Sequence, residues 1–255
     1  MAFWHLDMTR HARRKLFDLG LVGPHRQFFG VAGAGFSALL VLGPVLVSGV
    51  TPVSLLATTV FYAIGVALAG LGLYRTFPHS SLGMCNAVTL FRLLLVSILV
   101  LSLLSVSGDA VTIFAVAVLA LALDGVDGWF ARREGRVSDF GARFDMEVDS
   151  ALALVLACLA FQNETAGPLV LLLALPRYLF AAATLVFPWL DGPLPERFSR
   201  KVVCVLQLGT LIVVQVPFVP PMISGGLVAV SALALIWSFE RDVVWLWRAR
   251  AAARV

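Results

Sequence analysis

The sequence predicts an all-α integral membrane protein, and three observations support this prediction. Hydrophobic residues make up 60% of the 255 residues, charged residues only 13%, and the mean hydropathy is +0.95. A soluble domain has no single core large enough to hide so much apolar surface. Long uncharged stretches recur along the chain, and two of them, 28–74 and 202–239, are each long enough for two spans of about 20 residues. The basic residues are also segregated between the apolar stretches.

Turn residues divide the long stretches and give eight predicted transmembrane helices. The breaks are the segment Gly49–Pro52 in the first stretch and Pro217–Pro221 in the last. The predicted spans are 29–49, 53–74, 84–106, 110–132, 144–162, 166–187, 200–218 and 222–240. Residues 1–27 mix Arg and Lys with Phe, Trp and Leu, which is typical of a basic amphipathic helix on an anionic membrane surface. Residues 241–255 form a second basic segment at the other end of the chain.

The distribution of basic residues predicts the orientation of the spans. Every Lys and Arg except Arg177 lies in the N-terminal segment, near an even-numbered connection or in the C-terminal tail. The odd-numbered connections contain only Asp109 and Glu164 as charged residues. An odd number of spans would scramble this separation. The positive-inside rule therefore places both termini and the even-numbered connections in the cytoplasm.

One acid-rich segment, 124–149, interrupts the apolar sequence at the fourth connection. By the rise of an α-helix, Asp124 and Asp127 lie ~12 and ~8 Å inside the fourth span, and Asp145 and Asp149 lie ~3 and ~9 Å inside the fifth. Each pair shares a helix face, so four carboxylates are expected to converge at similar depth. Three arrangements can offset their repulsion and desolvation: divalent cations, protonation as in a proton relay, or salt bridges to Arg132, Arg136 and Arg143.

A second polar stripe opens the third span. Asn86, Thr89 and Arg92 follow one another at intervals of three on an otherwise apolar helix. Thr89 can bond its own helix and Arg92 can extend toward the membrane surface, in which case the stripe has only a structural role. Arg92 lies deep enough, however, that a charged partner inside the bundle is the favoured interpretation.

Basic residues in the second half of the chain indicate an anion-binding region. Arg177 follows Pro176 inside a span, where an arginine must face a cavity or an anion. The mouth of the seventh span carries further candidates, for which ordinary membrane anchoring is the structural alternative: Arg197, Arg200, Lys201 and, two turns further in, Gln207.

The acid-rich segment reads Asp124-x2-Asp127-Gly128-x2-Ala131-Arg132-x8-Gly141-x3-Asp145-x3-Asp149. This pattern resembles the signature of the CDP-alcohol phosphotransferases, the CDP-alcohol phosphatidyltransferase superfamily, at all of its positions. The resemblance covers a six-helix core, residues 82–240. Residues 28–75, the two additional transmembrane helices, and the N-terminal segment 1–27 lie outside it.

The resemblance implies transfer of a substituted phosphoryl group from a CDP-activated alcohol to a second alcohol, with release of CMP. It implies Mg²⁺ or Mn²⁺ as cofactor, with two ions bound, and a two-metal mechanism. Asp149 corresponds to the base that takes the acceptor proton and to a possible further metal ligand. The other metal ligands are Asp124, Asp127 and Asp145. The residues expected to bind the CDP-substrate are Asn86, Thr89, Arg92, Gly128, Ala131, Arg132 and Gly141.

The acceptor is predicted from the mouth of the seventh span. Family members that use phosphorylated acceptors often have Gly-Lys-x2-Thr-x2-Gln there, and this chain keeps Lys201 and Gln207 but has Arg200 and Cys204 for the Gly and Thr. The acceptor-binding candidates are Arg177, Arg200, Lys201 and Gln207.

These residues predict a phospholipid-biosynthesis enzyme that uses CDP-diacylglycerol and glycerol 3-phosphate. The alternatives are inositol phosphate or serine as acceptor, a CDP-linked head group with a lipid alcohol, or, from another class, an ion-coupled transporter. A transporter is expected to show inverted repeats, and the sequence has no such symmetry. The predicted setting is a bacterial inner membrane with a cytoplasmic active site. The protein is expected to be a homodimer in contact with membrane lipids and to bind no nucleic acid.

Overall fold

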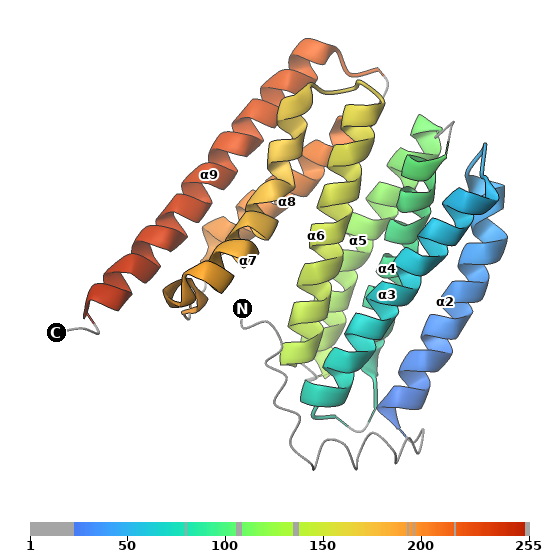
Figure 1. Cartoon of the computed structure of the whole chain (residues 1–255), viewed down its shortest axis with the longest axis horizontal. Coiled ribbons are helices and arrows are strands. Elements are labelled where there is room, and N and C mark those ends of the chain that lie inside the picture. Colours follow the sequence, from blue (N-terminus) through green and yellow to red (C-terminus); the bar gives the residue numbers. More distant parts are fainter. Residues whose placement is uncertain are drawn as a thin grey trace.

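The computed structural model describes residues 23–79, 81–105, 109–134, 138–192, 194–195, 197–216 and 218–252, without the side chains of 126–134, 191, 251 and 252. The regular elements in these residues are helices, and the described chain contains no strand (Figure 1). The α-helices are α2 (Pro24–Leu46), α3 (Pro52–Thr76), α4 (Gly83–Leu104), α5 (Ala110–Glu134), α6 (Asp139–Gln162), α7 (Leu175–Val186), α8 (Phe198–Val213) and α9 (Pro221–Ala252). Two 3₁₀ helices, η1 (Pro168–Leu173) and η2 (Pro188–Asp191), flank α7.

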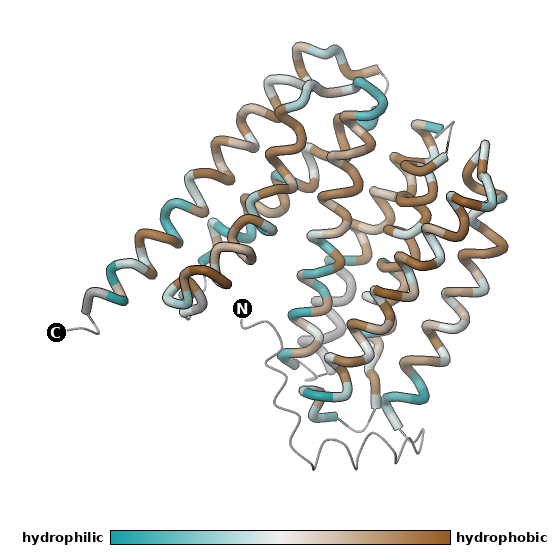
Figure 2. Tube along the Cα trace, viewed as in Figure 1, coloured by the Kyte–Doolittle hydropathy of each residue, from teal (hydrophilic) through white to brown (hydrophobic). Residues whose placement is uncertain are grey.

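Length and composition of these helices confirm the predicted fold class, an all-α integral membrane protein. Four of the described helices are long and apolar enough to cross a membrane: α2, α3, α4 and the part of α9 up to Arg250. Shorter apolar helices are Ala110–Gly125 within α5 and Leu175–Val186. Hydrophobic residues cover most of the tube in Figure 2, and hydrophilic residues gather on the lower parts of α6 and α9.

Helical structure overlaps each predicted span; most helix ends lie within five residues of the predicted ends, and two regions differ more. The sixth span is not one continuous helix but η1 followed by α7. Pro176 stands in the first turn of α7 and has no N–H to continue a preceding α-helix, which explains the break. The eighth helix continues to Ala252, twelve residues past the predicted end at 240, because the membrane limits the apolar stretch and not the helix itself.

Local sequence signals set most of the helix starts. Proline occupies the first turn of α2 and α3, where its missing N–H costs no hydrogen bond. Thr51 and Ser54 form a capping box at the start of α3, with the Ser54 amide donating to Thr51 Oγ1 at 3.1 Å. Ser138 accepts from the Gly141 amide at 3.1 Å, so α6 starts at Asp139, five residues before the predicted span.

The carboxylate of Asp109 plays the same capping role before α5. It accepts from the amide of Thr112 at 3.0 Å and from its hydroxyl at 2.9 Å. These hydrogen bonds hold the pKa of Asp109 below its ordinary value.

Most of the predicted N-terminal segment 1–27 is not described by the structure, because residues 1–22 lie outside the described residues. α2 begins at Pro24, within the last residues of that segment.

α4 is the central helix of the amino-terminal half. It packs against α2, α3, α5 and α6. In its most apolar stretch 72% of the residues are buried, compared with 17% in α2 and 28% in α3. α4 is therefore shielded by its neighbours, whereas α2 and α3 present most of their surface to the surrounding lipid.

The two additional helices are joined to each other and to α4 by specific contacts. The buried Tyr62 hydroxyl donates to the Ala32 carbonyl at 3.0 Å, and a Cβ at Gly35 would overlap that hydroxyl. Gln27 Oε1 of α2 accepts from the amide of Leu82 at 2.8 Å, at the start of α4. These contacts fix the end of α4 that carries the Asn86 stripe.

Candidate functional site

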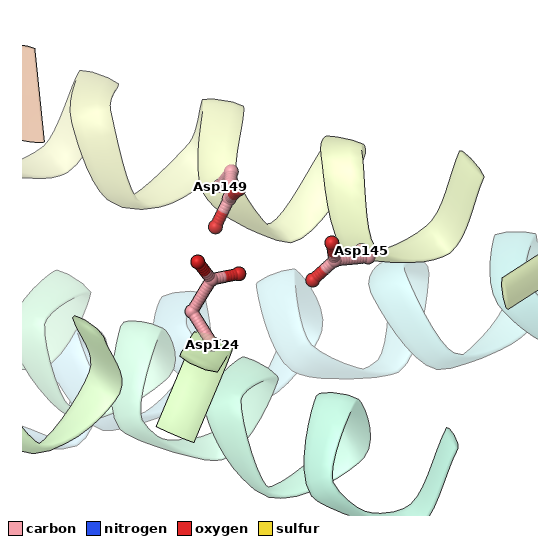
Figure 3. A group of neighbouring side chains, drawn as sticks. All are labelled: Asp124, Asp145 and Asp149. Carbon is pink, nitrogen blue, oxygen red and sulfur yellow. The ribbon is translucent and has the colours of Figure 1, made fainter. Parts of the chain in front are cut away.

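Three carboxylates of the acid-rich segment meet between α5 and α6. Asp124 comes from α5, and Asp145 and Asp149 come from α6; Figure 3 shows them pointing toward one another. One oxygen of each lies within 4.8 Å of the others. Their side chains are 30%, 35% and 31% exposed, so the cluster is open on one side. This confirms that residues from both sides of the fourth connection converge.

The spacing along the chain explains this meeting. Asp124 lies ten residues before the end of α5, and Asp149 lies ten residues after the start of α6. At the rise of an α-helix both are therefore ~15 Å from the short connection between the two helices. Asp145 and Asp149 are four residues apart on α6 and share one face.

Arg92 supplies a positive charge to all three carboxylates. Its side chain is fully buried, at 0% exposure. Nη1 lies 3.0 Å from Asp124 Oδ1 and also pairs with Asp145, while Nη2 pairs with Asp149. The expected charged partner of Arg92 is thus the carboxylate cluster itself. The sequence-based salt-bridge hypothesis named Arg132, Arg136 and Arg143 instead and did not consider Arg92.

The rest of the Asn86 stripe lies against the start of α6. Asn86 and Thr89 are 1% and 3% exposed. Thr89 Oγ1 donates to the Cys85 carbonyl, which is the back-bonding that the structural alternative expected. Asn86 donates to the Leu82 carbonyl, but its own Oδ1 is buried and accepts no hydrogen bond within the described part of the chain.

Gly141 lies directly beside that Asn86 oxygen. A Cβ at Gly141 would come within 3.2 Å of both Asn86 Oδ1 and Ser138 Oγ. Glycine therefore lets α4 and α6 approach closely at this point. Its predicted contact with the nucleotide stays a prediction.

Four signature residues belong to α5, and the structure describes their backbone but not their side chains: Asp127, Gly128, Ala131 and Arg132. Their roles stay predictions. Asp127 is three residues after Asp124, so helical geometry places both on one face of α5.

The acceptor-binding candidates lie farther along the chain, and two of them have carboxylate partners. Arg177 donates to Glu147 Oε1 at 2.6 Å and to Ser150 Oγ at 3.0 Å. Arg200 makes two hydrogen bonds of 3.0 Å with Asp242. Arg177 therefore has the anion that its position in a span required, and that anion is a residue of the protein.

The other two candidates differ from each other. Gln207 donates to the Leu173 carbonyl at 2.6 Å and so links α8 to η1. Lys201 is exposed. α8 packs against both α5 and α6, the two helices that carry the carboxylate cluster.

Sequence reasoning missed three residues of this region: Glu147, Ser150 and Asp242. Glu147 and Ser150 stand within the acid-rich helix, and their spacing from Asp145 and Asp149 puts them on another face of it. Asp242 follows the last predicted span, and an acidic residue within that basic tail could have been noticed in the sequence. None of these sequence features predicts which helix carries the arginine that pairs with the acid.

The chemistry of the donor set fits a hard divalent cation. The three grouped ligands are carboxylate oxygens, without sulfur or imidazole, and such ligands suit Mg²⁺ and Mn²⁺. Among the described side chains, the three carboxylates also outnumber the arginine, Arg92, that pairs with them. The identity of the ion stays a prediction.

Comparison with known families places this site within a recognised domain. A family model described as CDP-alcohol phosphatidyltransferase matches residues 82–239, more than half of the chain, and these residues include the carboxylate cluster and Arg92. No curated protein and no solved structure shows a significant match to the chain. The matched range does not include α2 and α3. The chain belongs to the CDP-alcohol phosphatidyltransferase family.

Proposed function

We propose that this protein transfers the phosphatidyl group of CDP-diacylglycerol to glycerol 3-phosphate and releases CMP. Membership of the family gives the general reaction, the transfer of a phosphatidyl group from a CDP-alcohol in a membrane. The observation that carries the proposal is the convergence of Asp124, Asp145 and Asp149 within the matched domain.

The reaction assigns a role to each part of the carboxylate cluster. A hydroxyl oxygen of the acceptor forms a bond to the lipid-bearing phosphorus of the donor, and the pyrophosphate P–O bond breaks so that CMP leaves. Asp149 accepts the proton of the attacking hydroxyl. Asp124, Asp127 and Asp145 would hold divalent cations, two in the proposed mechanism, which when bound offset the charge of the pyrophosphate and polarise the phosphorus.

Residues beside the cluster would bind and orient the nucleotide. The buried Asn86 Oδ1 has no donor in the described part of the chain, so a donor on the CDP moiety can satisfy it. Thr89 and Arg92 continue the same stripe, and Gly128, Ala131, Arg132 and Gly141 complete the proposed CDP-binding set.

An acceptor that carries a phosphate is supported by the charges at the start of α8. Asp242 is shared by two arginines, Arg200 at 3.0 Å and Arg197 at 3.9 Å. Among the described residues here, one carboxylate neutralises only one of these two charges, and Lys201 adds another. A surplus of positive charge here favours a phosphate-bearing alcohol over serine. Arg177 and Gln207 belong to the proposed acceptor region with less support, since both already bond to protein groups.

The decisive experiment measures CMP and lipid product together. Purified protein is given CDP-diacylglycerol and, in separate reactions, glycerol 3-phosphate, inositol phosphate, serine or no acceptor. We expect CMP release that depends on glycerol 3-phosphate and a matching amount of phosphatidylglycerophosphate. CMP release with another acceptor would keep the reaction and change the substrate. No CMP with any of them would refute the proposed reaction and favour the ion-transport alternative.

We also propose that both termini and the active site face the cytoplasm of a bacterial inner membrane. Single cysteines near Arg136 and at Glu164 test this orientation by labelling with a membrane-impermeant reagent. Cys204 is exposed and must be replaced first. We expect labelling near Arg136 only from the cytoplasmic side and at Glu164 only from the other side. The reverse pattern would overturn the proposed orientation.

A further inference from the structure

Arg92 contacts the same three residues that could hold a metal ion. The possible ligands are one oxygen from each of Asp124, Asp145 and Asp149, and Arg92 forms an ion pair with all three. A divalent cation and the guanidinium group therefore draw on one set of negative charges.

Arg92 and the three carboxylates differ in their exposure. The Arg92 side chain is fully buried and extends from α4, which is more buried than the three other described helices long and apolar enough to cross a membrane. Each carboxylate side chain keeps about a third of its surface exposed, so a soluble ion has access to the carboxylates while Arg92 stays enclosed. Arginine stays protonated in proteins, so Arg92 keeps its positive charge and still repels a divalent cation that binds the same carboxylates.

Counting formal charges shows what this arrangement holds. Among the described side chains of the cluster, three carboxylates and the Arg92 guanidinium give a net charge of about −2 at neutral pH. Arg92 therefore offsets part of the repulsion between the aspartates when no metal is bound. Its charge also repels any divalent cation that enters the cluster.

We infer that Arg92 is a resident counter-cation of the carboxylate cluster, which holds the three aspartates together without metal and lowers their affinity for divalent cations. This inference rests on the proposed function, because it takes the aspartates as metal ligands. In the complex with metal and CDP-substrate, the guanidinium exchanges carboxylate contacts for phosphate oxygens, since a buried arginine needs an anion in either state. Arg92 thereby makes tight metal binding depend on the nucleotide.

The test compares metal affinity with nucleotide affinity. Mn²⁺ binding to the full-length protein in detergent is measured by electron paramagnetic resonance, with and without CDP-diacylglycerol, for wild type and Arg92→Gln. We expect the variant to bind Mn²⁺ alone at least tenfold more tightly and to bind CDP-diacylglycerol at least tenfold more weakly. These opposite changes distinguish the inference from a structural role, which would weaken both, and from a nucleotide contact alone, which would leave Mn²⁺ affinity unchanged.

Arg177→Gln is the matched control. It removes the same charge from another span, but Arg177 pairs with Glu147 and Ser150 rather than with the cluster. Its Mn²⁺ affinity is expected to equal that of wild type. A similar tightening in this control would mean that the effect is long-range electrostatics, and the inference would fail.

Thermal unfolding supplies a second measurement and a check on folding. Arg92→Gln is expected to unfold at a lower temperature than wild type without metal and to gain more from added Mn²⁺. If Arg92→Gln does not fold, Arg92→Lys takes its place, with a Mn²⁺ affinity expected between the other two because lysine lacks the guanidinium fork. Equal or weaker Mn²⁺ binding by the folded variant overturns the inference.

Asp124→Asn separates this inference from the proposed function. Loss of Mn²⁺ binding in Asp124→Asn with unchanged binding in Arg92→Gln refutes only the role of Arg92. Unchanged Mn²⁺ binding in Asp124→Asn would refute the metal site itself, and with it the proposed mechanism.

Discussion

The carboxylate cluster around Arg92 and the ion pairs at the start of α8 both pair aspartates with arginines, but the balance of charge is opposite in the two regions. At Arg92, three carboxylates from α5 and α6 share one fully buried guanidinium. At the start of α8, two arginines share Asp242, whose side chain is 9% exposed. Among the described side chains, the first region has surplus negative charge and the second has surplus positive charge.

This difference indicates which ligand each region can accept. A cluster with excess carboxylates is stabilised by a further cation, and a cluster with excess arginines by an anion such as phosphate. The pair of Arg177 and Glu147 lies between these cases, with one charge of each sign and Glu147 61% exposed. The charge imbalance of the described side chains supports the proposed metal at one cluster and the proposed phosphate at the other.

Removal of metal is expected to give the largest effect. A chelator should abolish CMP release, and either Mg²⁺ or Mn²⁺ should restore it, because a carboxylate-only site prefers hard cations. The assay follows CMP at saturating CDP-diacylglycerol, with Ca²⁺ added back as a comparison. Full activity in metal-free buffer would end the two-metal mechanism.

Asp149→Asn is expected to lower kcat by ~10²–10⁴-fold, the usual worth of a general base. Asparagine keeps the size of the side chain, so CDP-diacylglycerol should still bind. Asp124→Asn, the matched variant on α5, should instead weaken metal and nucleotide together, with partial rescue by extra Mg²⁺. Normal turnover by Asp149→Asn would mean that Asp149 has no catalytic role.

Arg200→Gln tests the surplus of positive charge at α8. It should raise KM for glycerol 3-phosphate about tenfold, since a hydrogen bond to a charged group is worth about 1.5 kcal/mol. KM for CDP-diacylglycerol should not change. The control is Arg241→Gln, because Arg241 donates to Ser199 Oγ and its guanidinium lies over the Trp237 ring. Equal effects of the two substitutions would argue for general electrostatics.

Glu147→Gln is expected to have the smallest effect. The carboxylate is 61% exposed, and exposed ion pairs contribute less than ~1 kcal/mol. The thermal unfolding temperature should fall slightly, and the rate of CMP release should stay close to that of wild type. A large loss of activity would show that the Arg177 pair belongs to the reaction and not only to the packing of α6 against α7.

Much of the fold was predictable because the apolar stretches and turn residues are local signals. Thr51, Ser138 and the prolines determine where helices begin through bonds to their own neighbours in the sequence. The break before α7 was not predicted, although Pro176 marks it. α9 is also longer than the predicted span. Hydropathy predicts the apolar stretch that lies in the membrane, but it does not predict how far the helical hydrogen bonds continue past that stretch.

The sequence alone predicted a helical membrane protein and the convergence of four aspartates, because a short connection and the helical repeat place them at similar depth. Asp124, Asp145 and Asp149 meet as predicted, and the side chain of Asp127 lies outside the described part of the chain. Only the tertiary structure decided which cations accompany which acids. Arg92 reaches the cluster from 32 residues before Asp124, and Asp242 holds Arg200 from 42 residues away. Such partners depend on how helices pack side by side, and ion pairing has no sequence period from which this packing can be read.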